Sequence, residues 1–342
     1  MTKLQIAYVL CTEQLDYFYT LAASAALTRT TVPACKMVCV MDRKTFKLAK
    51  SARIRVRDWV DQVVVVKTPH RTPEMKSRYL KTTLRSHLVG DFLYLDVDAV
   101  IVDPQLLTQL DCECMAASQN RDHCDHVGAF PDYIGQLLYE PLGWDYPFLP
   151  YVNAGVTFCR DNAQCHALYS RWHELWNEQV TRMGRHLDQP ALNRALWESP
   201  SRLKLMAREF NSPVDVGPEF ETGAWIYHYY ISCYSGIPKA ESLLGIASRI
   251  IRRRGRVNPG LLRWMLNQKQ AFLKEPDKIL SAIQQGLWVH AFHLFQDLLR
   301  NTTSTAQGQS FGWHFGSEDR NPITNTSPEN STVSLTDKCL GS

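Results

Sequence analysis

The sequence lacks any long hydrophobic run and any strong excess of one charge. No stretch approaches the roughly 18 apolar residues that a membrane-spanning helix needs. The 38 basic and 34 acidic side chains leave a formal net charge of +4, which is too small to indicate a nucleic-acid partner. With 45% apolar and 21% charged residues, the composition is that of a soluble globular protein with one or two domains.

We expect no secretory signal either. Residues 1–10 hold an apolar stretch that is too short for a signal peptide and favours a first strand instead. The ten cysteines are scattered along the chain, several of them within apolar segments, and we expect most of them to be reduced core residues. The sequence therefore predicts a cytoplasmic protein.

Apolar strands alternate with helices through the first part of the chain. Strands are predicted at 5–11, 35–41 and 62–66, and helices at 15–28, 43–52 and 73–88. This alternation is typical of an α/β protein with a mostly parallel sheet, and such sheets bind ligands at the carboxyl ends of their strands. Further strands are predicted at 115–117, 151–159 and 225–230, and helices at 104–110, 162–180, 188–197 and from 238 to about 300.

The predicted organisation has three parts. Residues 1–240 form the α/β domain, residues 241–300 form a helical extension, and residues 301–342 form a polar tail. Because the tail is dominated by Ser, Thr, Asn and Gly, it buries too little apolar area to offset its ordering entropy. We expect it to be mostly disordered.

Two carboxylates stand at the end of a very apolar segment. Asp96 and Asp98 follow the run Phe92–Leu95, and side chains at i and i+2 of an extended chain point the same way. Neighbouring carboxylates repel each other, and a hard divalent cation that also binds phosphate oxygens would satisfy them. The pattern predicts a metal site that receives a diphosphate. The alternative is an Asp pair that caps a helix or faces water.

Further polar residues are candidates for the same site. Arg78, Lys81 and Arg85 share one helix face, where they could neutralise a diphosphate or simply be solvated. Asn153 offers a donor and an acceptor to sugar hydroxyls. Gly155, within a predicted strand, indicates close approach of a ligand or another backbone segment.

Three residues later in the chain complete the set of candidates. Asp188 and Gln189 begin a predicted helix, where a capping role for Asp188 is a sufficient explanation on its own. His228 lies in an apolar strand, where a lone histidine is usually a core residue. It becomes a candidate third metal ligand if the fold brings it to Asp98.

These pieces, in this order, resemble the GT-A-fold glycosyltransferases, and most of all glycosyltransferase family 8, the glycogenin and bacterial galactosyltransferase group. The matching segments are Ser77–Leu80, Leu93–Asp98, Asn153–Val156, Asp188–Asn193 and His228. The resemblance implies a Rossmann-like catalytic domain over residues 1–240 and a nucleotide-diphosphate sugar, UDP-sugar above all, as donor. It also implies a divalent metal, Mn²⁺ or Mg²⁺, and transfer with retention of the anomeric configuration.

The resemblance assigns roles residue by residue. Asp96, Asp98 and His228 match the metal ligands. The residues that match donor contacts are Thr12, Tyr17, Arg78, Asp96, Asn153 and Lys239, although Lys239 lacks the Pro-Trp that follows the family's lysine, and Tyr17 could equally be a core residue. Asp188 is the nucleophile candidate, but the resemblance favours same-face attack, with Gln189 as an amide beside the reacting carbon.

Two other interpretations stay open. The chain could keep this fold as a catalytically silent sugar-nucleotide-binding protein. It could also be a phosphatase of the haloacid-dehalogenase type, although three predicted strands precede Asp96 and no Gly-Asp-x-x-x-Asp follows it. The sequence does not indicate whether the acceptor is a glycan, a lipid-linked sugar or a protein.

Two further clusters carry alternatives of their own. One group of cysteines and histidines could bind zinc, although its spacing fits no common zinc motif: Cys112, Cys114, His123, Cys124 and His126. A basic amphipathic segment could lie on the inner face of an anionic membrane, or its apolar stripe could pack on the catalytic domain and leave solvated arginines. These arginines are Arg249, Arg252, Arg253, Arg254 and Arg256.

Overall fold

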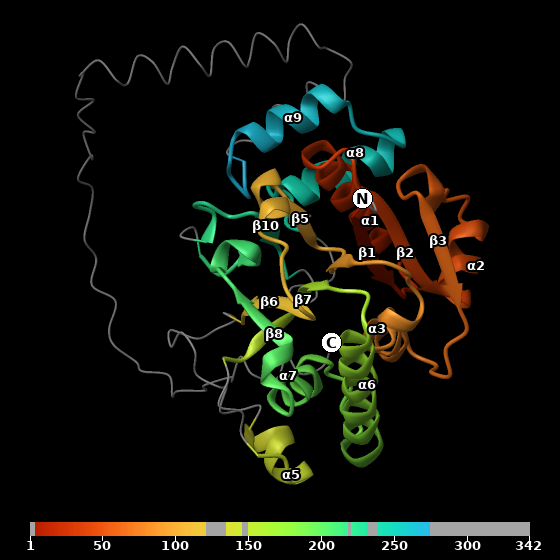
Figure 1. The fold of residues 1–342 in the computed structure, drawn as a ribbon. Coiled ribbons are helices and arrows are strands. Elements are labelled where there is room, and N and C mark those ends of the chain that lie inside the picture. Colours follow the sequence, from red (N-terminus) through yellow and green to blue (C-terminus); the bar gives the residue numbers. More distant parts are fainter. Residues whose placement is uncertain (1–3, 121–134, 146–149, 218–219, 231–237, 274–342) are drawn as a thin grey trace, which may run out of the picture. The chain divides into compact units, whose positions relative to one another are not determined.

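A computed structural model of the protein describes residues 4–120, 135–145, 150–217, 220–230 and 238–273 (Figure 1). The predicted polar tail lies outside these residues, and so does the part of the predicted helical extension that follows residue 273. Among the described helices, none has the length and apolar character that crossing a membrane requires.

The main sheet has seven strands in the order β3-β2-β1-β4-β7-β6-β8. Neighbouring strands run parallel, except that β7 is antiparallel to both β4 and β6. The mostly parallel α/β sheet that the alternation predicts is therefore confirmed. The strands are β1 (Gln5–Leu10), β2 (Lys36–Asp42), β3 (Gln62–Val66), β4 (Phe92–Leu95), β6 (Met115–Gln119), β7 (Val152–Cys159) and β8 (Leu203–Met206).

Helices cover both faces of this sheet. Alternate residues of each buried strand point to opposite sides, so each face presents apolar side chains for helices to pack against. On one side Tyr8 belongs to the core cluster that includes side chains of α1 (Asp16–Thr31). On the other side Ala7 belongs to the cluster built with α3 (Pro73–Thr82) and α6 (Ala163–Met183). The sheet is thus the middle of three layers, and both faces of its central strands β1, β4 and β7 are buried.

The remaining helices differ from the prediction mainly at their ends. The predicted 73–88 helix stops at Thr82 and is followed by a short 3₁₀ turn, and the predicted 104–110 helix is a 3₁₀ helix at Pro104–Thr108. The other helices are α2 (Arg43–Ser51), α5 (Glu140–Leu142), α7 (Gln189–Trp197), α8 (Leu243–Arg254) and α9 (Pro259–Asn267).

Helix α8 lies against α1 (Figure 1). Its aliphatic side chains, such as Leu244 and Ile250, are buried, and Arg252 forms a 2.6 Å ion pair with Asp16 at the start of α1. Of the two alternatives for this segment, packing on the α/β domain is the one that the structure shows. The arginines at the end of α8 are exposed.

A second, three-stranded sheet has the order β5-β10-β9. It consists of β5 (Ala99–Ile101), β9 (Ser212–Pro213) and β10 (Ile226–His228). The apolar segment that begins at Phe92 forms β4 and β5, which belong to different sheets, because residues 96–98 form a turn closed by a 2.9 Å hydrogen bond from Ala99 N to Asp96 O. This turn carries both aspartates out of the main sheet.

Candidate functional site

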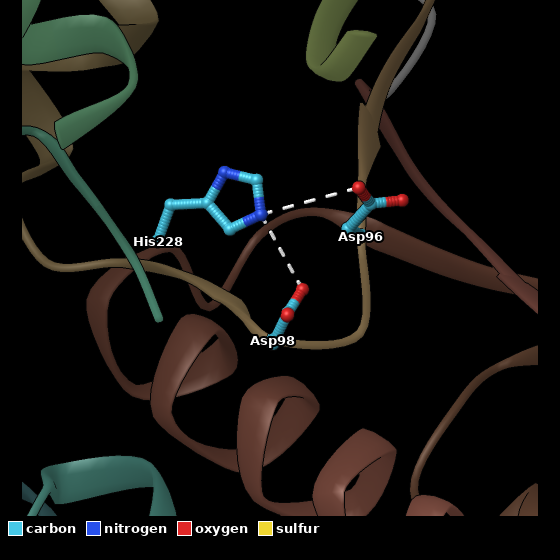
Figure 2. Close-up of side chains that lie close together, drawn as sticks. All are labelled: Asp96, Asp98 and His228. Atoms are coloured by element: carbon cyan, nitrogen blue, oxygen red, sulfur yellow. Dashed lines mark ion pairs between the residues drawn. The ribbon is translucent and has the colours of Figure 1, made fainter. Parts of the chain in front are cut away.

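Asp96, Asp98 and His228 point their polar atoms toward one another (Figure 2). Each offers one ligand atom, and these atoms all lie within 4.8 Å of one another. His228 Nε2 is 3.4 Å from Asp98 Oδ1 and 3.9 Å from Asp96 Oδ2. The structure thus brings together the three residues that the sequence predicted as metal ligands. Elsewhere in the described part of the chain, no other such group of three or more His, Cys, Asp or Glu is present.

Strand pairing explains why His228 meets the aspartates. β10 runs antiparallel to β5, with His228 opposite Ala99, and Tyr229 N donates a 3.1 Å hydrogen bond to Asp98 O. Asp96 is held from the other side, because its N–H donates a 2.8 Å hydrogen bond to Gly155 O in β7. Backbone hydrogen bonds of two sheets therefore fix the positions of all three side chains.

Gly155 leaves the space that this cluster needs. A Cβ atom at this position would lie 2.6 Å from Asp96 Oδ2 and closer still to His228 Cε1, and both distances are too short for real contacts. The close approach that the sequence indicates at Gly155 is therefore the approach of Asp96 and His228 themselves. Two carboxylates and one imidazole, converging beside a residue without a side chain, are a donor set that fits a divalent cation.

Two cations lie next to this cluster, the buried Lys81 and the partly buried Arg78. Lys81 Nζ is 3.3 Å from Asp96 Oδ1 and 3.1 Å from Asp188 Oδ2, and Arg78 Nε is 3.0 Å from Asp188 Oδ1. The Tyr94 hydroxyl also donates to Asp96 Oδ1. Burial, reinforced by the charge of Asp96, raises the pKa of Tyr94, so the phenol stays protonated and remains a donor.

Asp188 does not cap α7. Its side chain makes no capping hydrogen bond, so the capping role that local sequence suggests is wrong. Burial acts to raise the pKa of Asp188, but the charges of Lys81 and Arg78 outweigh it and hold the pKa below its ordinary value. The carboxylate is therefore ionised and engaged by two cations.

Two amide side chains from the same region bind the N-terminal part of β7. Gln189 Oε1 accepts a 3.0 Å hydrogen bond from Ala154 N. Asn153 Oδ1 accepts a 2.7 Å hydrogen bond from Gly155 N, and its Nδ2 donates to Tyr230 Oη at 3.3 Å. Both residues thus shape the backbone beside the cluster, and their predicted roles toward a donor sugar stay predictions.

The other predicted donor contacts are placed as follows. Thr12 is buried and its N–H donates a 2.9 Å hydrogen bond to Thr45 Oγ1. Burial raises the pKa of the half-buried Tyr17, and the charge of Asp98 adds to this effect. Lys239 Nζ forms a 2.8 Å ion pair with Asp215. The contact of each with a donor stays a prediction.

Arg85 is not part of the site. It follows the end of α3, and its guanidinium donates to the backbone carbonyls of Leu88 and Gly90. The prediction that Arg85 shares a helix face with Arg78 is wrong, because helix α3 ends at Thr82 and does not reach Arg85. In the proposed zinc group, His123, Cys124 and His126 lie outside the described residues.

Among known proteins, several solved glycosyltransferase structures are similar to this chain. No family model matches it, and no curated protein does. Mouse xyloside xylosyltransferase 1 is 13% identical, with a TM-score of 0.44, over 67% of this chain and 98% of that one. The galactosyltransferase LgtC, in complex with donor and acceptor sugar analogues, is 15% identical, with a TM-score of 0.44, over 80% of this chain and 98% of that one.

An active-site mutant of LgtC is similar to the same degree. It is 14% identical, with a TM-score of 0.46, over 80% of this chain and 98% of that one.

Proposed function

We propose that the protein is a metal-dependent glycosyltransferase that moves a sugar from a nucleotide-diphosphate sugar to an acceptor. The observation that carries the proposal is the meeting of Asp96, Asp98 and His228 beside two cations, the buried Lys81 and the partly buried Arg78. This cluster lies just beyond the carboxyl end of β4, where α/β sheets bind ligands. A divalent cation flanked by permanent positive charge suits a diphosphate.

The proposed metal is Mn²⁺, with Mg²⁺ as the alternative. Its ligands would be Asp96, Asp98 and His228, and an imidazole nitrogen beside two carboxylates suits a transition ion better than Mg²⁺. When bound, such a cation would stabilise the negative charge that develops on the diphosphate leaving group.

The chain's own cations would do two things for the donor. Lys81 and Arg78 are buried or nearly so and are oriented by Asp188, so their positive charge is fixed in place and attracts a polyanion. Asp188, whose two oxygens lie against these cations, is stabilised as a carboxylate and is a weak nucleophile for the same reason. We therefore propose that Asp188 positions the cations and that transfer proceeds by same-face attack, with retention.

UDP as the nucleotide and a hexose as the transferred group belong to this proposal and rest on the sequence resemblance. Membrane contact through the exposed arginines of α8 is a further part of it, and it would have to be electrostatic because the apolar stripe of that helix is buried. A cytoplasmic location completes the proposal.

The test is release of nucleoside diphosphate from a panel of sugar nucleotides, each with Mn²⁺, Mg²⁺ or a chelator. The wild-type protein should release nucleoside diphosphate from one of the sugar nucleotides, and this release should depend on the metal. The Asp98→Asn variant should release none. Lys204→Ala, on the edge strand β8, is the matched control and should behave as wild type. Metal-dependent nucleotide binding without release would favour the silent sugar-nucleotide-binding protein. If the protein shows no nucleotide binding and no release of nucleoside diphosphate, the proposal is wrong.

A further inference from the structure

Asn211 is buried beside His228 and contacts its other ring nitrogen. Asn211 Oδ1 lies 2.9 Å from His228 Nδ1, and Asn211 is 2% exposed. An amide oxygen only accepts hydrogen bonds, so Nδ1 is the nitrogen that carries the proton. In a neutral imidazole the lone pair is then on Nε2, the atom that faces Asp98 and Asp96.

Backbone structure fixes Asn211 in this position. It ends the 3₁₀ turn Arg208–Phe210, with its N–H donating a 3.2 Å hydrogen bond to Arg208 O. The next residue begins β9, which pairs with β10 in a parallel register that sets Ser212 opposite Tyr227. Asn211 therefore reaches the His228 ring from the position just before the neighbouring strand β9.

Packing alone does not account for an asparagine here. Its Nδ2 is buried and has no hydrogen-bond partner among the residues that the structure describes. A buried donor left unpaired destabilises the folded protein, and an apolar side chain of similar size would avoid this cost. The residue keeps a polar group at this cost, and the group that it does use is the oxygen directed at His228.

We propose that Asn211 is a positioning residue that holds His228 in the tautomer able to bind a divalent cation. With Nδ1 protonated, the Nε2 lone pair and the carboxylates of Asp96 and Asp98 face a common point. A divalent cation at that point could bind all three groups. Without the acceptor at Asn211, the proton can move to Nε2 and hydrogen-bond Asp98, which lies 3.4 Å away. A protonated nitrogen is not a metal ligand, so that hydrogen bond would close the site.

The inference rests on the proposed cation site, and two variants of similar size test it. Asn211→Asp keeps an acceptor opposite Nδ1, whereas Asn211→Leu removes it. Loss of a group that orients a metal-bound histidine typically lowers metal affinity 10–100-fold. Titration of the full chain with Mn²⁺, followed by the electron paramagnetic resonance signal of free Mn²⁺, should show this loss for Asn211→Leu and a change of less than about fivefold for Asn211→Asp.

The tautomer itself is measured by nitrogen-15 NMR of the metal-free wild-type protein, with His228→Gln identifying the signals. The expected spectrum has the proton on Nδ1. A proton on Nε2 in the wild type, or Mn²⁺ binding by a folded Asn211→Leu as tight as by the wild type, would overturn the inference. If the wild-type protein binds no Mn²⁺ at all, the proposed function fails, whereas the spectrum still decides whether Asn211 sets the tautomer.

Discussion

Lys81 Nζ lies 3.1 Å from Asp188 Oδ2, and both side chains are buried. The pair joins α3 to the start of α7, and it reaches the proposed metal site because Lys81 also contacts Asp96. Trp172 supports it from α6, since its indole N–H donates a 2.8 Å hydrogen bond to Asp188 O. Asp188 is thus a counter-charge that holds cations in place next to the proposed metal ligands.

Replacing that counter-charge should destabilise the protein strongly. Asp188→Asn removes the partner that Lys81 and Arg78 share, and breaking a buried pair such as Lys81–Asp188 typically costs about 3 kcal/mol. Urea unfolding measures the loss. The control is Asp145→Asn, because the Asp145 side chain is 78% exposed and its replacement should cost less than about 0.5 kcal/mol. Equal effects of the two substitutions would contradict a structural role for Asp188.

The same pair predicts how stability changes in acid. Because the pKa of Asp188 is lowered in the folded protein, its contribution is fully present above the unfolded-state pKa of about 3.9. It is lost as the pH falls from there through the folded-state pKa. The urea midpoint of the wild type should therefore drop more steeply between about pH 5 and pH 3 than that of Asp188→Asn. Parallel curves would show that Asp188 has no such shift.

A histidine on α6 predicts a second, separate pH window. Burial lowers the pKa of His173, and the neighbouring His70 adds to the effect, while Thr82 Oγ1 lies 2.8 Å from His173 Nδ1. Since the folded protein favours the neutral ring, stability is full above the unfolded-state pKa of about 6.5 and declines as the pH falls below it. His173→Gln should flatten the decline of the urea midpoint between about pH 6.5 and pH 5. An unchanged slope would exclude His173 as its source.

Adding a single methyl group at Gly155 should abolish metal binding. The Cβ of Gly155→Ala would enter the space between Asp96 and His228, so at least one of these ligands must move. Mn²⁺ at about 100 times its dissociation constant should stabilise the wild type by about 2.7 kcal/mol and should leave Gly155→Ala unaffected.

Gly143→Ala is the control for that measurement. The backbone φ of Gly143 is +69°, and a Cβ there would meet nothing within 4 Å. The substitution should therefore cost about 1 kcal/mol of backbone strain and keep the full response to Mn²⁺. If Gly155→Ala responds to Mn²⁺ as the control does, the proposed ligand geometry is wrong.

The part of the site that lies close together in the sequence was predictable. Asp96 and Asp98 follow an apolar strand, and that local pattern alone indicates a ligand-binding strand end. His228 comes much later in the chain, and only the family resemblance connected it with the aspartates. What unites them is the antiparallel register of β10 and β5, which depends on tertiary structure and leaves no local signature.

Tertiary contacts also explain what the sequence did not predict. Asp188 precedes a helix and fits the local rule for an N-cap. Its carboxylate instead forms ion pairs with Lys81 and Arg78, which are distant in the sequence. Asn211 stands beside the two-residue strand β9, which is too short to show any periodicity. β8 likewise lacks the alternation of apolar and polar residues that indicates a strand, because its two exposed side chains are consecutive.

The most direct test of the account is thermal unfolding of the full chain with a panel of nucleoside diphosphates, each with and without Mn²⁺. One nucleotide at about 100 times its dissociation constant should stabilise the wild type by about 2.7 kcal/mol, and only when Mn²⁺ is present. Asp98→Ala should remove this response while remaining folded. If the well-folded wild-type protein shows no metal-dependent stabilisation by any of the nucleotides, the proposed metal-dependent binding of a nucleotide-diphosphate sugar is wrong.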